Sequence, residues 1–174
     1  MPICGAVEGP LDEIVLRRLA AESGLTVDAV YGRMGKEHLL GRLTGYNNAA
    51  RFQPWVVLVD LDGDAECAPL ARTTWLAAPA RHMQLRVVVR ALEAWLLADA
   101  KGLAAFLRVP QAPIPPHPEG EADPKRLLVD LARRSRKGDI RADVVPRPGS
   151  GRAVGPGYLS RMTEFVLGPW RPEV

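Results

Sequence analysis

The chain has 174 residues, of which 47% are hydrophobic and 25% are charged, with a formal net charge of +3. This length and apolar fraction suit a single domain over residues 1–174 with one core. No segment approaches the roughly 18 consecutive apolar residues of a membrane span, and no secretory leader pattern opens the chain. We therefore expect a cytoplasmic protein that has no membrane partner.

Strands and helices alternate over the first hundred residues. Short apolar runs predict strands at 2–7, 25–31, 55–60 and 85–89. Apolar residues at helical spacing predict helices at 10–24, 36–51 and 68–77, and one more that opens near Glu93 and continues to Phe106. This alternation predicts an α/β fold in which helices flank a mostly parallel sheet and ligands bind at its carboxyl edge.

The composition changes after residue 107. Five prolines between Arg108 and Pro124 predict a loop without regular structure. Asp123 is placed to cap a helix over 124–136, a Gly/Pro loop follows at 146–157, and a last short helix covers 158–166. We expect a core of about residues 1–107, a Pro-rich loop at 108–124, and a basic, irregular helical part at 125–174.

Three carboxylates, Asp60, Asp62 and Asp64, alternate directly after the predicted strand at 55–60. At roughly 4 Å, two such charges repel by about 1 kcal/mol in water and about 4 kcal/mol at an effective dielectric of 20. A cation should relieve this repulsion, and oxygen ligands favour Mg²⁺, Mn²⁺ or Ca²⁺ over zinc. The pattern predicts a divalent-metal site, with an acidic turn that caps the next helix as the alternative.

Further acids are expected at the same edge of the sheet. Glu8 follows the first strand, Asp12 lies one helical turn beyond it, and Glu93 begins the helix after the fourth strand. With Asp60, Asp62 and Asp64, these side chains could hold one or two Mg²⁺ or Mn²⁺ ions. A carboxylate left off the metal would then act as general acid or base.

Two motifs, Val7-Glu8-Gly9 followed by Asp12 and the segment from Val59 to Asp64, resemble those of the Toprim domain superfamily. Toprim domains are the catalytic modules of topoisomerases, bacterial primases and OLD-family nucleases. The resemblance covers about the first hundred residues and implies a Toprim-like fold. It also implies that Glu8 is the general acid/base or a metal ligand, and that Asp60 and Asp62 bind the metal in the catalytic site.

The resemblance extends to other acids and to partners. Asp64 matches a third acid found in some members, and Asp12 matches the second acidic position of the OLD-type first motif. The segment Leu92–Asp99 resembles a small bacterial Toprim-like family of undetermined function, which adds Glu93. The implied activity is metal-dependent cleavage of nucleic-acid phosphodiesters, DNA foremost, with a separate ATPase, in phage defence or DNA repair. A homodimer is left open.

The basic C-terminal part suggests a different function. Four arginines there are candidates for contact with nucleic-acid phosphates: Arg133, Arg134, Arg147 and Arg152. A solvated helix face and loop would explain them equally well. If no chemistry occurs, the chain is a metal-stabilised adaptor that contacts nucleic acid or a partner protein through this region.

The acidic motif also resembles a second family. Asp60-Leu61-Asp62-Gly63 is similar to the first motif of haloacid-dehalogenase-type phosphatases, in which the first Asp is the nucleophile. Asp139 and Asp143 resemble that family's last acidic motif. Against this alternative, the nucleophile strand of that family usually lies near the N-terminus, and Asp139 follows an arginine-rich helix and not an apolar strand.

Overall fold

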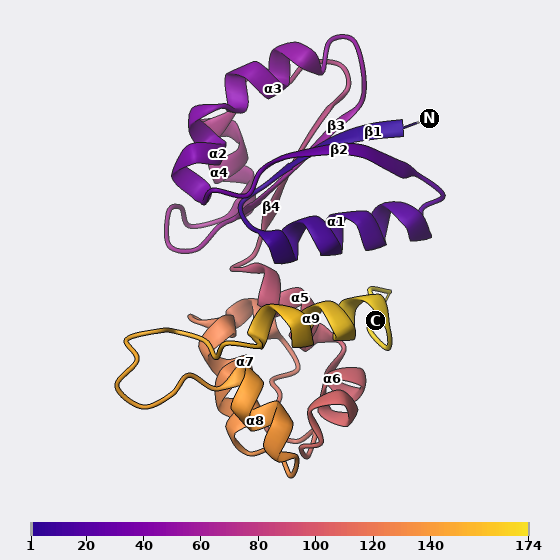
Figure 1. The fold of residues 1–174 in the computed structure, drawn as a ribbon. Coiled ribbons are helices and arrows are strands. Elements are labelled where there is room, and N and C mark those ends of the chain that lie inside the picture. The colour runs from indigo at the N-terminus through magenta and orange to yellow at the C-terminus, as the bar shows by residue number, and fades with distance from the viewer. Residues whose placement is uncertain (1, 174) are drawn as a thin grey trace. The chain divides into compact units, whose positions relative to one another are not determined.

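The computed structural model describes residues 2–173 and divides at Val89 into two compact units, which are described separately (Figure 1). The first unit, up to Val89, contains the sheet. The second, from Arg90, is helical. The helices at 92–107, which we expected within the core that packs around the sheet, belong to the second unit. The single-domain organisation stays a prediction.

The first unit is built on a four-stranded sheet with strand order β2-β1-β3-β4, and every pair is parallel. The strands are β1 Pro2–Val7, β2 Thr26–Gly32, β3 Trp55–Asp60 and β4 Met83–Val88. Each was predicted within two residues of its observed start and end. The predicted α/β class, with a parallel, Rossmann-like sheet flanked by helices, is confirmed.

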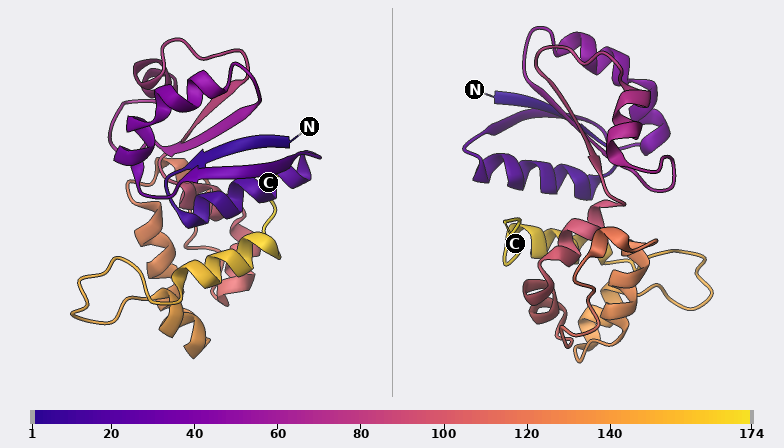
Figure 2. Two further views of the ribbon diagram at one scale, coloured as in Figure 1. Left: turned by 45° about the horizontal axis from the view of Figure 1, so that its top comes forward. Right: turned by 180° about the vertical axis from the view of Figure 1, so that it is seen from behind.

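Helices cover both faces of the sheet (Figures 1 and 2). Helix α1, Pro10–Glu22, lies on one face. Helices α2 (Lys36–Gly41), α3 (Leu43–Ala49) and α4 (Ala68–Trp75) lie on the other. The single helix predicted over 36–51 is two helices that meet at Arg42. Gly41 stands immediately before this break, where its low helix propensity weakens the turn.

Close packing fixes α1 and α3 on the sheet. A Cβ on Gly5 would lie 2.5 Å from Cδ2 of Leu16, so the glycine lets α1 approach β1. On the opposite face, the ring of Trp55 stacks on those of Tyr31 and Tyr46, with centroids 5.3 and 5.2 Å apart. Trp55 is only 4% exposed and is therefore a core residue.

The second unit consists of short helices around apolar side chains such as Leu97, Leu128 and Phe165. They are α5 Leu92–Ala98, α6 Ala100–Leu107, the 3-10 turn η1 Pro118–Gly120, α7 Pro124–Arg133, α8 Gly138–Val144 and α9 Tyr158–Leu167. No helix within residues 2–173 has both the length and the apolar composition needed to cross a membrane.

Local capping explains several boundaries in the second unit. Asp123 caps α7 by accepting a hydrogen bond from the main-chain N–H of Arg126, as predicted. Asp99 caps α6 in the same way through Gly102, so the helix predicted to continue from Glu93 to Phe106 is divided in two. Helix α8 was not predicted, since it has only seven residues and begins with glycine, and its two buried apolar residues, Ile140 and Val144, are too few to give a helical pattern.

Candidate functional site

The first and third strands bring their acids together at the carboxyl edge of the sheet. Glu8 follows β1 and Asp60 ends β3, and these strands are neighbours. Oε1 of Glu8 accepts a hydrogen bond of 2.7 Å from the main-chain N–H of Asp60. The Oδ1 atom of Asp60 is buried and accepts no hydrogen bond, although the residue has other interactions.

A lysine provides a cation at the acidic turn. Lys36, the first residue of α2, places Nζ 2.7 Å from Oδ2 of Asp62 and 2.9 Å from Oδ2 of Asp64. The same nitrogen lies 5.7 Å from the ring centroid of Trp75, within the range of a cation–π contact. The repulsion expected among the acids is therefore relieved, at least for Asp62 and Asp64, by a side chain of the protein.

The charge of this cluster changes the protonation of Glu8. Burial raises the pKa of Glu8 above its ordinary value, and the negative charges of Asp12 and Asp62 raise it further. The hydrogen bond from Asp60 and the charge of Lys36 act in the opposite direction. A carboxyl group with a raised pKa can hold a proton closer to neutral pH, as a general acid must.

The other charged residues near Glu8 lie in different environments. Asp12 lies in the first turn of α1 and is buried, whereas Asp62 and Asp64 are exposed. Asp62 adopts a left-handed φ of 48°, a conformation that Asp tolerates better than most residues. Lys36 has a pKa shifted in two directions: burial lowers it, but hydrogen bonds to Asp62 and Asp64 prevail and raise it.

The acids of the first unit match the chemistry of Mg²⁺ or Mn²⁺ without forming a ready-made cage. All their donors are carboxylate oxygens, which these ions prefer. Yet within residues 2–173 no group of three or more His, Cys, Asp or Glu side chains is arranged to hold a metal ion. Lys36 already engages one oxygen of Asp62 and one of Asp64, so an ion that bound these same oxygens would have to displace its ammonium group.

Glu93 has partners of its own in the second unit. Its side chain is 3% exposed, and Oε1 accepts a 2.8 Å hydrogen bond from the hydroxyl of Tyr158. Lys125 Nζ lies 3.4 Å from the same oxygen, and Oε2 is buried without a hydrogen-bond partner. These contacts join α5 to α7 and α9, so Glu93 has a structural role in its own unit.

The predicted arginines all belong to the second unit and are exposed. Arg133 lies at the end of α7, 3.6 Å from Asp130. Arg147 and Arg152 lie in the loop between α8 and α9, and within the described residues their side chains form no ion pair. Arg134 follows α7.

The acids that suggested a phosphatase motif are engaged elsewhere. Asp139 and Asp143 both bind Arg161 of α9, at 2.9 and 2.8 Å. Desolvation acts to raise the pKa of Asp139, but the main-chain N–H of Ile140, the charge of Arg161 and the main-chain N–H of Asp139 together prevail and lower it. These ion pairs account for both carboxylates within the second unit.

Comparison with known proteins identifies no relative. No family model, no curated protein and no solved structure matches the chain.

Sequence reasoning did not identify Lys36. The available signal was its position, four residues after the end of β2, because a parallel neighbour of β1 must end at the same edge of the sheet. A basic residue at the start of the helix after that strand could therefore have been assigned to the acidic turn.

Proposed function

We propose that the chain is a Toprim-like enzyme that cleaves nucleic-acid phosphodiesters with the help of Mg²⁺ or Mn²⁺. The observation that supports this most directly is the 2.7 Å hydrogen bond from the Asp60 main chain to Glu8. It joins the two motifs on which the Toprim resemblance rests. DNA is the expected substrate, and a separate ATPase in phage defence or DNA repair is the expected partner.

Glu8 is the acid/base of the proposed reaction. The bond from Asp60 fixes Oε1, which leaves Oε2 to exchange a proton with the substrate. In hydrolysis, a water oxygen bonds to phosphorus and that water loses a proton to solvent, while the bond from phosphorus to the leaving sugar oxygen breaks. Glu8 supplies a proton to the leaving oxygen and is then reprotonated from solvent. The raised pKa of Glu8 favours the protonated form that this step consumes.

Asp60 and Asp62 would be the principal metal ligands, and Asp12 and Asp64 would complete the site or its outer shell. A bound divalent ion would polarise the phosphate and neutralise developing charge. Glu93, which Tyr158 and Lys125 already hold, stays a predicted member of that outer shell.

The test is nicking of supercoiled plasmid by the purified chain with Mg²⁺, with Mn²⁺ or with a chelator. Glu8→Gln keeps an oxygen to accept the bond from Asp60 but removes the exchangeable proton, and we expect a loss of about 100-fold or more. Glu119→Gln, at an exposed position of the second unit, is the control and should nick normally. Metal-independent nicking, or full activity of Glu8→Gln, contradicts the proposal.

A non-catalytic adaptor is the second candidate, and the position of Lys36 favours it. A cluster in which a lysine already pairs with two of the acids, Asp62 and Asp64, can be stable without a bound metal and without catalysing a reaction. An adaptor should retain its partner binding in Glu8→Gln and lose it in Arg133→Ala with Arg134→Ala. A nuclease should instead lose cleavage activity in Glu8→Gln.

A further inference from the structure

Three neighbouring hollows surround the loop from Pro146 to Gly157 in the second unit. Their volumes are about 300, 380 and 300 Å³. Arg147 lines the first and second, and Arg133 and Pro146 line the second and third. Because they share these residues, the hollows are adjacent to one another along α7, α8 and the loop, and we call the three together the track.

The track is strongly cationic. Its lining includes six basic side chains, Lys125, Arg126, Arg133, Arg141, Arg147 and Arg152, but only two acids, Asp123 and Asp130. Asp123 already caps α7, and Asp130 lies 3.6 Å or more from its arginine neighbours. Asp130 is thus within ion-pair distance of Arg126 and Arg133, and Lys125 pairs with Glu93 at 3.4 Å. The lining cations that form no ion pair within the described residues are Arg141, Arg147 and Arg152.

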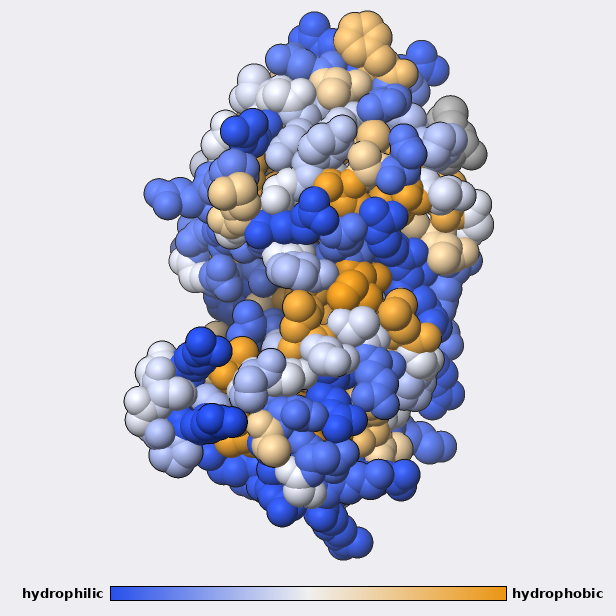
Figure 3. Space-filling model, in the orientation of Figure 1, coloured by the Kyte–Doolittle hydropathy of each residue, from blue (hydrophilic) through white to orange (hydrophobic). Residues whose placement is uncertain are grey.

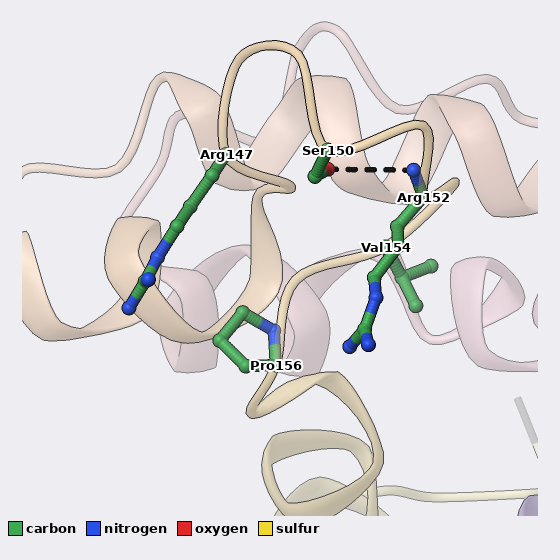
Figure 4. A pocket seen from close by; sticks show the side chains of 5 residues that line it. All are labelled: Arg147, Ser150, Arg152, Val154 and Pro156. Carbon is green, nitrogen blue, oxygen red and sulfur yellow. Dashed lines mark hydrogen bonds between the residues drawn. The ribbon is translucent and has the colours of Figure 1, made fainter.

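Two arginines of the loop are available for a ligand. Figure 4 shows the side chains of Arg147 and Arg152 on opposite sides of Pro156, with a hydrogen bond of 3.3 Å from the main-chain N–H of Arg152 to Ser150 Oγ. Both arginines are exposed and form no ion pair within the described residues. In Figure 3 the loop projects at the lower left and carries strongly hydrophilic side chains.

The chemistry of the lining points to phosphate and away from bases. Guanidinium groups bind phosphate oxygens through two parallel hydrogen bonds. None of the residues that line the three hollows is aromatic, so the track has no platform on which a base could stack. A ligand held here would be recognised by its backbone charge and not by its sequence.

We propose that this track, defined by the six basic residues above, binds the phosphodiester backbone of a nucleic acid independently of base sequence. The inference rests on the proposed function only for the choice of nucleic acid as the polyanion. It also refines the predicted set of contacts. Arg126 and Arg141 line the track, whereas Arg134 lines none of the three hollows.

The test measures binding of fluorescein-labelled single-stranded DNA of mixed sequence by anisotropy, in chelator, over a series of salt concentrations. Arg147→Gln with Arg152→Gln should weaken binding about tenfold or more at low salt. The slope of log K against log salt should become shallower by about 1.4, since each lost phosphate contact on a single strand contributes about 0.7. The matched control is Lys101→Gln with Arg136→Gln, which removes equal charge at exposed positions outside the track.

Equal losses in the two double variants would overturn the proposal, as would an absence of binding by the unsubstituted chain. An inorganic polyphosphate that competes better than DNA at equal phosphate concentration would overturn the assignment to nucleic acid. The chelator separates this test from the nuclease proposal, because binding should persist in Glu8→Gln even if no cleavage is ever observed. The loss of binding expected in Arg147→Gln with Arg152→Gln is also measured without metal, so it can be observed whether or not the chain is a nuclease.

Discussion

Lys36 Nζ lies 2.7 Å from Oδ2 of Asp62, although the two residues are 26 positions apart in the chain. This contact places a built-in counter-ion in the acidic turn. A divalent ion that binds Asp62 competes with the ammonium group, so the lysine should weaken metal binding and limit it to conditions of high metal concentration.

Replacement of Lys36 by methionine should therefore increase the affinity for Mn²⁺, on the order of tenfold if the lost competition amounts to about 1.4 kcal/mol. The free energy of unfolding should fall by less than about 1 kcal/mol, because Asp62 and Asp64 are largely exposed and such ion pairs contribute little. Calorimetric titration and thermal unfolding measure the two effects. Lys101→Met, at an exposed site in the second unit, is the control; an unchanged or weaker affinity in Lys36→Met contradicts competition.

The sequence predicted where the acids gather but not what they contact. Glu8 and Asp60 each end an apolar run, and parallel strands end at a common edge, so their proximity followed from local patterns. The contact of Lys36 with the acidic turn depends on how β2 and α2 are placed in three dimensions. Likewise, the partners of Glu93 come from segments 32 and 65 residues farther along the chain, and no local pattern reveals them.

Glu8 should make stability depend on pH. Its pKa is raised in the folded state, chiefly by burial, so the folded protein binds this proton more tightly than the unfolded chain does. The contribution of Glu8 to stability is fully present below the ordinary value of 4.5 and is lost as pH rises through the raised pKa. Glu8→Gln, which mimics the protonated form, should therefore melt at a higher temperature than the unsubstituted chain at pH 7.

Melting curves at a series of pH values test this prediction. The advantage of Glu8→Gln should shrink as pH falls and vanish below 4.5. Glu119→Gln corrects for the change in net charge. An advantage that is equal at all pH values, or largest in acid, would show that burial does not raise the Glu8 pKa.

Replacement of two glycines of the first unit by alanine should change the free energy of unfolding in opposite directions. In Gly5→Ala the new Cβ meets Leu16 at 2.5 Å, and Leu16 is itself buried between α1 and the sheet, so overpacking should destabilise by about 1–3 kcal/mol. In Gly45→Ala, within α3, the Cβ meets nothing within 4 Å, and higher helix propensity should stabilise by about 0.5–1 kcal/mol. Urea unfolding measures both, and destabilisation by Gly45→Ala would contradict the helical assignment.

The buried pair of Tyr158 and Glu93 gives the sharpest test of the second unit. The hydroxyl donates to a carboxylate that is almost inaccessible to water, and the other carboxylate oxygen already lacks a partner. Loss of a hydrogen bond to a buried charged group costs about 1.5–3 kcal/mol. Tyr158→Phe should lower the free energy of unfolding by that amount, whereas Tyr31→Phe, at a residue that is 48% exposed, should change it by less than about 0.5 kcal/mol.

A double-mutant cycle with Glu93→Gln separates this bond from the loss of packing. If the hydroxyl acts through the carboxylate, the cost of Tyr158→Phe should be smaller when residue 93 carries no charge, because the remaining acceptor is then a neutral amide oxygen that is less costly to leave unpaired. Urea unfolding followed by circular dichroism measures the four free energies. Costs that add without coupling would show that the Tyr158 hydroxyl does not stabilise the unit through the Glu93 carboxylate, which would leave Lys125 as the partner that compensates the charge of Glu93.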